Sequence, residues 1–255
     1  MTSIILTVRP EPDCDLDVMA LARRDVPALA APLMTAVYDI GAGNAKAGLV
    51  DDGSCGGIVF TSRHAVTGLL RACGGTVRDT WRELPVFAVG RATGRVAVAA
   101  GFRDVTVGAG GGAGLVPMIA ARAASFSGPL LWPAARDRSF DMGAALAKVA
   151  EVRMFEVYRM VPVAKLADAA LAAISSGEVL AVILMSVRSA QLFRNRLADA
   201  GHEQARAGIA VIAGSRAIAD AAGLGWREIH VARRPTRARL LAIAALLYAR
   251  RDRVT

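Results

Sequence analysis

The feature that most constrains the fold is an internal repeat with a spacing of 124 residues. Two stretches, GGIVFTSRHAV and AVILMSVRSAQLF, share the order of an apolar run, a serine, a basic residue and a helix-like segment. Three pairs of landmarks keep this spacing without a gap: Ser62 and Ser186, Gly90 and Gly214, and Gly101-Phe102 and Gly225-Trp226. The period is too long for a solenoid. It predicts a duplication into two similar domains, for which 255 residues are sufficient.

Apolar strands alternate with helical segments in the same order in both halves. The runs at 84–90 and 103–108 in the first half correspond to those at 208–214 and 228–232 in the second. Helices are expected between the strands, for example at 65–72 and 140–150. Continuous apolar strands in this order are typical of parallel sheets covered by helices on both faces. The sequence thus predicts an α/β fold of two similar domains, each a parallel sheet flanked by helices.

Two extended stretches differ from the rest and sit at equivalent places in the two halves. They are PLMTAVYD at 32–39 and VYRMVPV at 157–163, and a polar, Gly-rich loop follows the first at 41–57. We interpret the extended stretches as a two-stranded β connection and the only covalent links between the domains. This gives a discontinuous domain of residues 1–36 plus 161–255 and a continuous domain of residues 39–158.

Four landmark residues are expected at the carboxyl ends of strands, where open parallel sheets bind their ligands. Ser62, Gly90, Ser186 and Gly214 each precede a helix. A serine there can cap the helix, while free backbone N–H groups and the helix dipole attract carboxylates or phosphates. Any one of these serines alone is explained as an ordinary N-cap. Because the pattern occurs twice, we expect two rims of donors that line one cleft between the domains.

The chain is strongly basic, with 31 Lys and Arg against 22 Asp and Glu and a net charge of +9. This favours anionic partners. Aromatic residues make up only 5% and no basic stripe alternates with them, so we expect no nucleic-acid partner. Two interpretations stay open: ordinary solvating arginines, and a polyanionic small molecule as ligand. Arg9, Arg63, Arg91, Arg136 and Arg138 follow strand ends and could each pair with a carboxylate.

Several common kinds of site are excluded or disfavoured. GAGGGAG at 108–114 nearly fits a dinucleotide fingerprint, but no acid occurs between Asp104 and Asp137, so we interpret it as a surface loop. The three cysteines and three histidines lack metal spacing, and we expect neither metal nor cofactor. An odd number of cysteines suits a reducing cytoplasm. No apolar run is long enough for a membrane span, and the N-terminus shows no signal peptide.

From the residues alone, the result is a two-domain α/β protein with an anion-binding interdomain cleft. Beyond this, the chain resembles the uroporphyrinogen-III synthase family over almost its whole length. The motifs that carry the resemblance are LTVRP at 6–10, VFTSRHAV at 59–66, VFAVGRATGRVAVAAGF at 86–102, EVYRMVP at 156–162, ILMSVRSAQLF at 183–193 and HVARRPTRARLL at 230–241. Family members have two α/β domains joined by a two-stranded ladder, which agrees with the crossing inferred above.

The resemblance implies a cyclising lyase of heme biosynthesis that acts in the cytoplasm. Its substrate would be hydroxymethylbilane, a linear tetrapyrrole with eight carboxylates, and its product uroporphyrinogen III, formed with loss of water and inversion of ring D. Tyr158 matches the family's tyrosine and would donate a proton or hydrogen bond to the leaving hydroxyl. The positions expected to bind substrate are Arg9, Ser62, Arg63, Gly90, Arg91, Thr93, Ser186, Gly214, Ser215 and Thr236.

Two positions depart from the family pattern. Met185 stands where a threonine is common, and Ala217 stands where the second half usually has the equivalent of Thr93.

We expect a monomer with no membrane partner, and hydroxymethylbilane synthase as an upstream partner. The alternative from another class is a non-catalytic, two-lobed sensor or binding protein for a small anion. A nucleotide-dependent transferase is a third and weaker choice.

Overall fold

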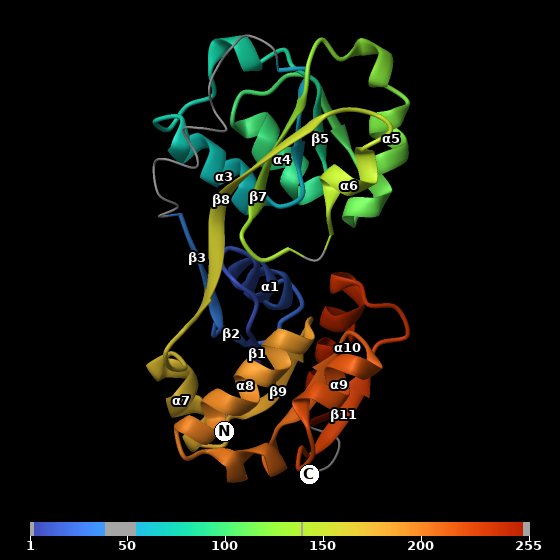
Figure 1. Cartoon of the computed structure of the whole chain (residues 1–255). Coiled ribbons are helices and arrows are strands. Elements are labelled where there is room, and N and C mark those ends of the chain that lie inside the picture. Colours follow the sequence, from blue (N-terminus) through green and yellow to red (C-terminus); the bar gives the residue numbers. More distant parts are fainter. Residues whose placement is uncertain (1–2, 39–54, 139, 252–255) are drawn as a thin grey trace. The chain divides into compact units, whose positions relative to one another are not determined.

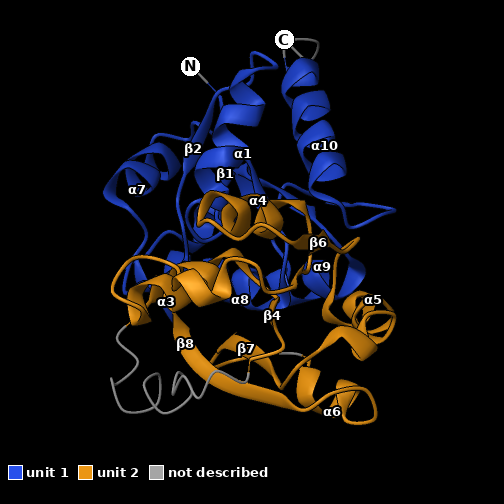
Figure 2. Cartoon of the chain, turned by 90° about the horizontal axis from the view of Figure 1, so that it is seen from above, with its two compact units in different colours: residues 1–35, 161–255 blue, residues 36–160 orange. Residues whose placement is uncertain are grey.

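The structure is a computed structural model that describes residues 3–38, 55–138 and 140–251 (Figure 1). It contains two compact units, coloured separately in Figure 2. Unit 1 comprises residues 1–35 and 161–255, and unit 2 comprises residues 36–160. The chain passes from unit 1 to unit 2 within strand β3 (Met34–Val37) and returns within strand β8 (Val152–Pro162). That these units fold as separate domains stays a prediction.

Unit 1 is built on a five-stranded parallel sheet. Its spatial order is β11 (Glu228–Val231), β10 (Ala210–Ala213), β9 (Val179–Leu184), β1 (Ile4–Thr7) and β2 (Ala28–Ala30). The helical segments are α1 (Asp13–Ala22), α7 (Asp168–Ser175), α8 (Val187–Asp199), η4 (Glu203–Gly208), α9 (Arg216–Ala222) and α10 (Arg237–Arg250). Successive residues of β1 face opposite sides of the sheet: Leu6 packs with Phe193 of α8, and Ile5 with Leu241 of α10.

Unit 2 contains a six-stranded sheet. Its spatial order is β3, β8, β7 (Leu130–Ala135), β4 (Gly57–Phe60), β5 (Val86–Ala88) and β6 (Val105–Val107), and the ladders from β8 to β6 are parallel. The helical segments are α3 (Arg63–Ala72), η1 (Asp79–Trp81), α4 (Arg91–Ala99), η2 (Gly112–Leu115), α5 (Val116–Ala120), η3 (Ala123–Ser125) and α6 (Met142–Leu146). Ile58 packs with Leu69 of α3 on one face, and Val59 with Ile119 of α5 on the other.

The two sheets repeat one strand order. β2-β1-β9-β10-β11 in unit 1 corresponds to β8-β7-β4-β5-β6 in unit 2. β9 ends at Leu184 and β4 at Phe60, so the shared spacing of 124 also relates the ends of these strands. The predicted fold class is confirmed: parallel sheets flanked by helices occur in both halves, and β3 pairs with β8 at the connection.

Some predicted elements have different bounds. The helix expected at 140–150 spans only α6. It begins after Asp141, which caps it by accepting a hydrogen bond from Ala144 N (3.1 Å), and it ends at Leu146, four residues before the expected end. Part of the Gly-rich segment 108–114 belongs to η2, although Gly110 and Gly111 have positive φ, as expected of a loop. Most of the predicted loop at 41–57 lies outside the described residues.

Candidate functional site

The two landmark serines both cap helices at the carboxyl ends of strands. Ser62 Oγ accepts a hydrogen bond from His64 N (3.1 Å) at the start of α3. Ser186 Oγ accepts from Ser189 N (3.0 Å) at the start of α8, and Ser189 Oγ accepts in return from Ser186 N (3.2 Å). Each cap satisfies only one or two of the four N–H groups that a helix start leaves open. The remaining N–H groups give each unit an anion-attracting position at the same place in the fold.

The other predicted rim residues also lie at helix starts. Ser215, directly after Gly214, accepts a hydrogen bond from Ile218 N (3.4 Å) and caps α9. Thr236 caps α10 through Arg239 N (3.4 Å). Gly90 precedes α4, and no side chain caps this helix. The first turn of α4 therefore offers backbone donors to an anion.

A pocket of about 420 Å³ lies at the carboxyl ends of the unit 2 strands, and we call it the strand-end pocket. Its lining residues are Thr61, Val89, Gly111, Gly112, Trp132, Ala135, Asp137, Arg138, Phe140 and Tyr158. Trp132 Nε1 donates a hydrogen bond to Thr61 Oγ1 (3.4 Å), and the Arg138 guanidinium lies 5.7 Å from the centroid of the Trp132 ring. Thus an aromatic wall and a cation meet where an open parallel sheet binds ligands.

Tyr158 is the buried hydroxyl at this pocket, with a side chain that is only 6% exposed. Its ring centroid lies 5.4 Å from that of His64 and 6.2 Å from that of Tyr38. Tyr38 Oη and His64 Nδ1 are 2.8 Å apart and form a hydrogen bond. Burial raises the pKa of Tyr158, and a hydrogen bond with Ser62 opposes this rise. The hydroxyl therefore stays protonated at neutral pH and can act as a donor.

Tyr38, His64 and Thr61 are site residues that the sequence analysis did not select. Thr61 was visible as the residue directly after β4 and before the Ser62 cap. Tyr38 and His64 lie 26 residues apart and meet only in the folded unit, so no local pattern joins them. The Arg71 guanidinium lies 4.3 Å from the centroid of the Tyr38 ring and brings a positive charge to this cluster.

Arg9 and Thr93 are less accessible than the sequence analysis assumed. Arg9 forms ion pairs with Asp13 (2.7 Å) and with Asp17 (3.5 Å), whose side chain is only 1% exposed. Arg237 also bonds the Asp17 carboxylate, so two arginines share it. These pairs neutralise much of the Arg9 charge. Thr93 is buried in α4, whereas Arg63 is the first residue of α3 and Arg91 the first of α4.

Arg136 also takes part in an ion pair. Its Nε donates to Glu156 Oε2 (3.1 Å), and Arg138 Nη1 lies 3.9 Å from Glu156 Oε1.

In the described part of the chain, no three His, Cys, Asp or Glu side chains gather closely enough to hold a metal ion. Nor does any described helix have the length and apolar character needed to cross a bilayer.

Comparison with known proteins gives the same family that the motifs suggested. A model of the family described as "Uroporphyrinogen-III synthase HemD" matches residues 18–242. The chain is similar in fold to a uroporphyrinogen-III synthetase of Helicobacter pylori (TM-score 0.58, 16% identity, 97% of this chain and 100% of that chain). It is also similar to a mutant uroporphyrinogen III synthase of Thermus thermophilus (TM-score 0.54, 17% identity, 100% of both chains). No individually curated protein matches the sequence significantly.

The family match spans most of the chain and includes the segments that carry Ser62, Gly90, Tyr158, Ser186 and Gly214. The resemblance inferred from the motifs is thereby confirmed. The chain belongs to the uroporphyrinogen-III synthase family, whose members are enzymes of tetrapyrrole biosynthesis.

Proposed function

We propose that the protein cyclises hydroxymethylbilane to uroporphyrinogen III, with loss of water and inversion of ring D, and is therefore a hydro-lyase. The observation that carries this proposal is Tyr158, a buried and protonated hydroxyl at the strand-end pocket of a chain from this family. The sensor or binding-protein alternative has no observation in its favour, because family membership supports the enzyme.

The chemistry makes few demands on catalytic side chains. The lone pair of a pyrrole nitrogen expels the terminal hydroxyl, which takes up a proton and leaves as water. The substituted carbon of ring D must then attack the carbon that the hydroxyl has left. The older bond from that ring D carbon to the bridge from ring C breaks, and the bridge carbon rejoins ring D at its unsubstituted carbon, which loses a proton and completes the inverted ring. The protein has to hold the chain in the conformation that favours this attack and to stabilise the developing charge. In this scheme Tyr158 donates a proton or a hydrogen bond to the leaving hydroxyl.

The substrate carboxylates are the second part of the proposal. We assign them to the helix starts of both units and to the nearby basic residues: Arg9, Ser62, Arg63, Gly90, Arg91, Thr93, Ser186, Gly214, Ser215 and Thr236. The net charge of +9 and the uncapped start of α4 support this assignment. The ion pairs of Arg9 make it the weakest member of the set.

The proposal also covers the cellular location, the oligomeric state, the upstream partner and the domain bounds. The odd number of cysteines supports a reducing cytoplasm. We propose a monomer that receives its unstable substrate from hydroxymethylbilane synthase. We further propose that the domains are residues 1–36 plus 161–255 and residues 39–158, because the two compact units begin and end close to these positions.

One assay tests the function directly. The purified protein is added to freshly made hydroxymethylbilane, and the type I and type III isomers of the product are separated after oxidation. We expect the type III isomer, since unprocessed substrate closes spontaneously without inverting ring D. If only type I forms, at the rate seen without protein, the proposed activity is wrong.

A further inference from the structure

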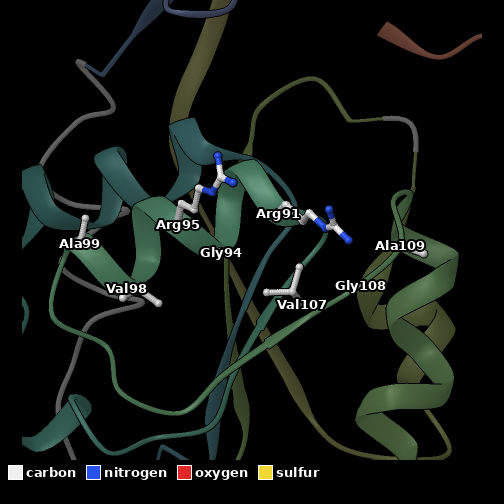
Figure 3. Close-up of a pocket in the computed structure, with 8 residues that line it drawn as sticks. All are labelled: Arg91, Gly94, Arg95, Val98, Ala99, Val107, Gly108 and Ala109. Carbon is white, nitrogen blue, oxygen red and sulfur yellow. The ribbon is translucent and has the colours of Figure 1, made fainter. Parts of the chain in front are cut away.

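A second depression in unit 2, of about 730 Å³, lies between α4 and the strand β6 (Figure 3). We call it the α4–β6 groove. Its lining residues are Arg91, Gly94, Arg95, Val98, Ala99, Val107, Gly108 and Ala109. β6 is the last strand of the sheet, so the groove occupies the edge of the sheet, next to the uncapped start of α4. None of its lining residues lines the strand-end pocket.

The floor of the groove is apolar and exposed. Val98 is 58% exposed and Val107 is 39% exposed, which is unusual for two valines that share one depression. Gly94 lets α4 approach the strand closely, because a Cβ atom there would come within 2.6 Å of Val107 Cγ2. The helix backbone and the two valines thus form a surface suited to a flat apolar group.

Arg91 and Arg95 supply two positive charges, one helical turn apart, along this floor. Neither guanidinium has an ion-pair partner among the residues that the structure describes. Elsewhere in unit 2, Arg122 pairs with Asp104 (2.6 Å). Figure 3 shows the Arg91 side chain extending from α4 toward the segment that contains Gly108 and Ala109. Two uncompensated guanidiniums beside an apolar floor favour a ligand that combines carboxylates with an apolar body.

The duplicated unit indicates that the fold itself does not require these groups. α4 begins at Arg91 and α9 at Arg216, so counted from these helix starts Ala219 stands in the place of Gly94 and Asp220 in the place of Arg95. Arg216 pairs with Asp220 on its own helix (3.1 Å), whereas the residue one turn after Arg91 is a second arginine. The two sheets nevertheless have the same strand order. The pair of uncompensated arginines in the first turns of α4 is therefore a property of unit 2 alone and needs a reason other than folding.

We propose that the α4–β6 groove binds a flat, apolar ring with carboxylate substituents. The ring lies on Val98 and Val107, and the carboxylates pair with Arg91 and Arg95. In one respect this rests on the proposed function: hydroxymethylbilane consists of four acidic pyrroles, and one of them occupies the groove, outside the strand-end pocket. Arg95 thereby becomes a further substrate-binding residue.

The first experiment uses a single pyrrole that carries one acetate and one propionate substituent. It is titrated into the ¹⁵N-labelled full-length protein and followed by two-dimensional NMR. We expect amide shifts in the groove and, for Arg95→Gln, an affinity about tenfold lower, the effect of losing one charge-assisted hydrogen bond. Val98→Gln tests the apolar floor and should also weaken binding. Lys148→Gln removes one charge from an exposed side chain on the same unit and should leave the affinity unchanged.

The second experiment separates this proposal from that of the enzymatic activity. With hydroxymethylbilane as substrate, Arg95→Gln should raise KM about tenfold and keep kcat within about twofold, with unchanged thermal melting. If the wild type forms type III product but Arg95→Gln and Val98→Gln match it in KM and in pyrrole binding, the groove proposal is wrong and the enzyme proposal stands. If the pyrrole binds in the groove but no type III product forms, the groove proposal stands and the enzyme proposal is wrong.

Discussion

Units 1 and 2 share a scaffold but differ in the chemistry at the ends of their strands. Both place a capped helix after the middle strand of the five-stranded duplicated core, at Ser186 and at Ser62. Unit 2 adds hydroxyls at Thr61 and Thr93, whereas the positions 124 residues later are Met185 and Ala217. The helix starts that both units share offer backbone N–H donors, which suit any carboxylate. The positions at which the units differ add specific hydroxyl side chains in unit 2.

The charges of the two units are also arranged differently. In unit 1, Arg9 and Arg237 are bound to the buried carboxylate of Asp17, which ties α1 to the start of α10. In unit 2, Arg91 and Arg95 have no acidic partner in the described chain. Arg9 and Arg237 thus stabilise unit 1, whereas Arg91 and Arg95 in α4 of unit 2 are uncompensated, as the ligand proposed above requires. The predictions below test this division.

The largest effect should come from breaking the buried ion pairs of unit 1. Asp17→Ala removes a carboxylate that is 1% exposed and leaves two arginines without their partner. We expect a loss of about 3 kcal/mol in the free energy of unfolding, at the low end for buried pairs because both arginines can reach water. Urea denaturation measures it. The matched change in unit 2, Asp104→Ala, removes an exposed partner of Arg122 and should cost about 1 kcal/mol or less. If Asp17→Ala and Asp104→Ala lost equal free energies of unfolding, the proposed difference between the ion pairs of the two units would be wrong.

The next largest effect concerns turnover. Tyr158→Phe keeps the buried ring and removes the hydroxyl, so kcat should fall about 10²-fold, the low end for a positioned proton donor, since the substrate's own nitrogen drives the elimination. The lost type III product should appear as type I. Isomer analysis measures both, and Tyr248→Phe in α10 of unit 1 is the matched control. A Tyr158→Phe variant that melts normally and forms type III at the wild-type rate would falsify the role of Tyr158.

The sequence carried more information about the scaffold than about the site. A constant spacing of 124 and continuous apolar strands predict the architecture because both follow from burial on the two faces of a sheet. Helix bounds were less accurate, since a single capping side chain such as Asp141 decides where a helix begins. The ion pairs of Arg9 could not be read from the sequence, because Arg9 precedes α1 and only the folded chain brings it to Asp13 and Asp17.

The side-chain clusters could not have been found in this way. Thr61 and Trp132 are 71 residues apart, and Tyr38 and His64 are 26 apart, so only the folded sheet brings each pair together. The exposure of Val98 is likewise invisible in the sequence, because it depends on β6 being the last strand. Contacts across the sheet, rather than patterns along the chain, determine these features.

A smaller effect distinguishes the two capping serines. Ser62→Ala and Ser186→Ala should each lower the free energy of unfolding by about 1 kcal/mol, the typical value of an N-cap. Only Ser62 bonds Tyr158, so Ser62→Ala should in addition reduce kcat several-fold, while Ser186→Ala should mainly affect KM. Thermal melts and steady-state kinetics measure the two effects. Complete loss of activity in either folded variant would mean that a catalytic hydroxyl has been overlooked.

The smallest effect is a difference in alkaline stability that is specific to Tyr158. Burial raises the pKa of this phenol above its ordinary value of 10.0, so the unfolded chain ionises at lower pH than the native one. The stabilising contribution is complete below pH 10 and is lost as pH rises through the pKa of the folded state. Tyr158→Phe should therefore lose less stability than the wild type between neutral pH and the alkaline range.

Thermal melts at a series of pH values measure this difference. Tyr38→Phe is the matched comparison, because burial also raises the pKa of Tyr38 but the Arg71 guanidinium and a hydrogen bond with Thr67 lower it. Its alkaline effect should be smaller than that of Tyr158, whose rise is opposed only by the hydrogen bond with Ser62. If Tyr158→Phe and the wild type lose stability in parallel, the phenol ionises equally in both states. It would then lie in water rather than in the buried cluster that keeps it protonated as a donor.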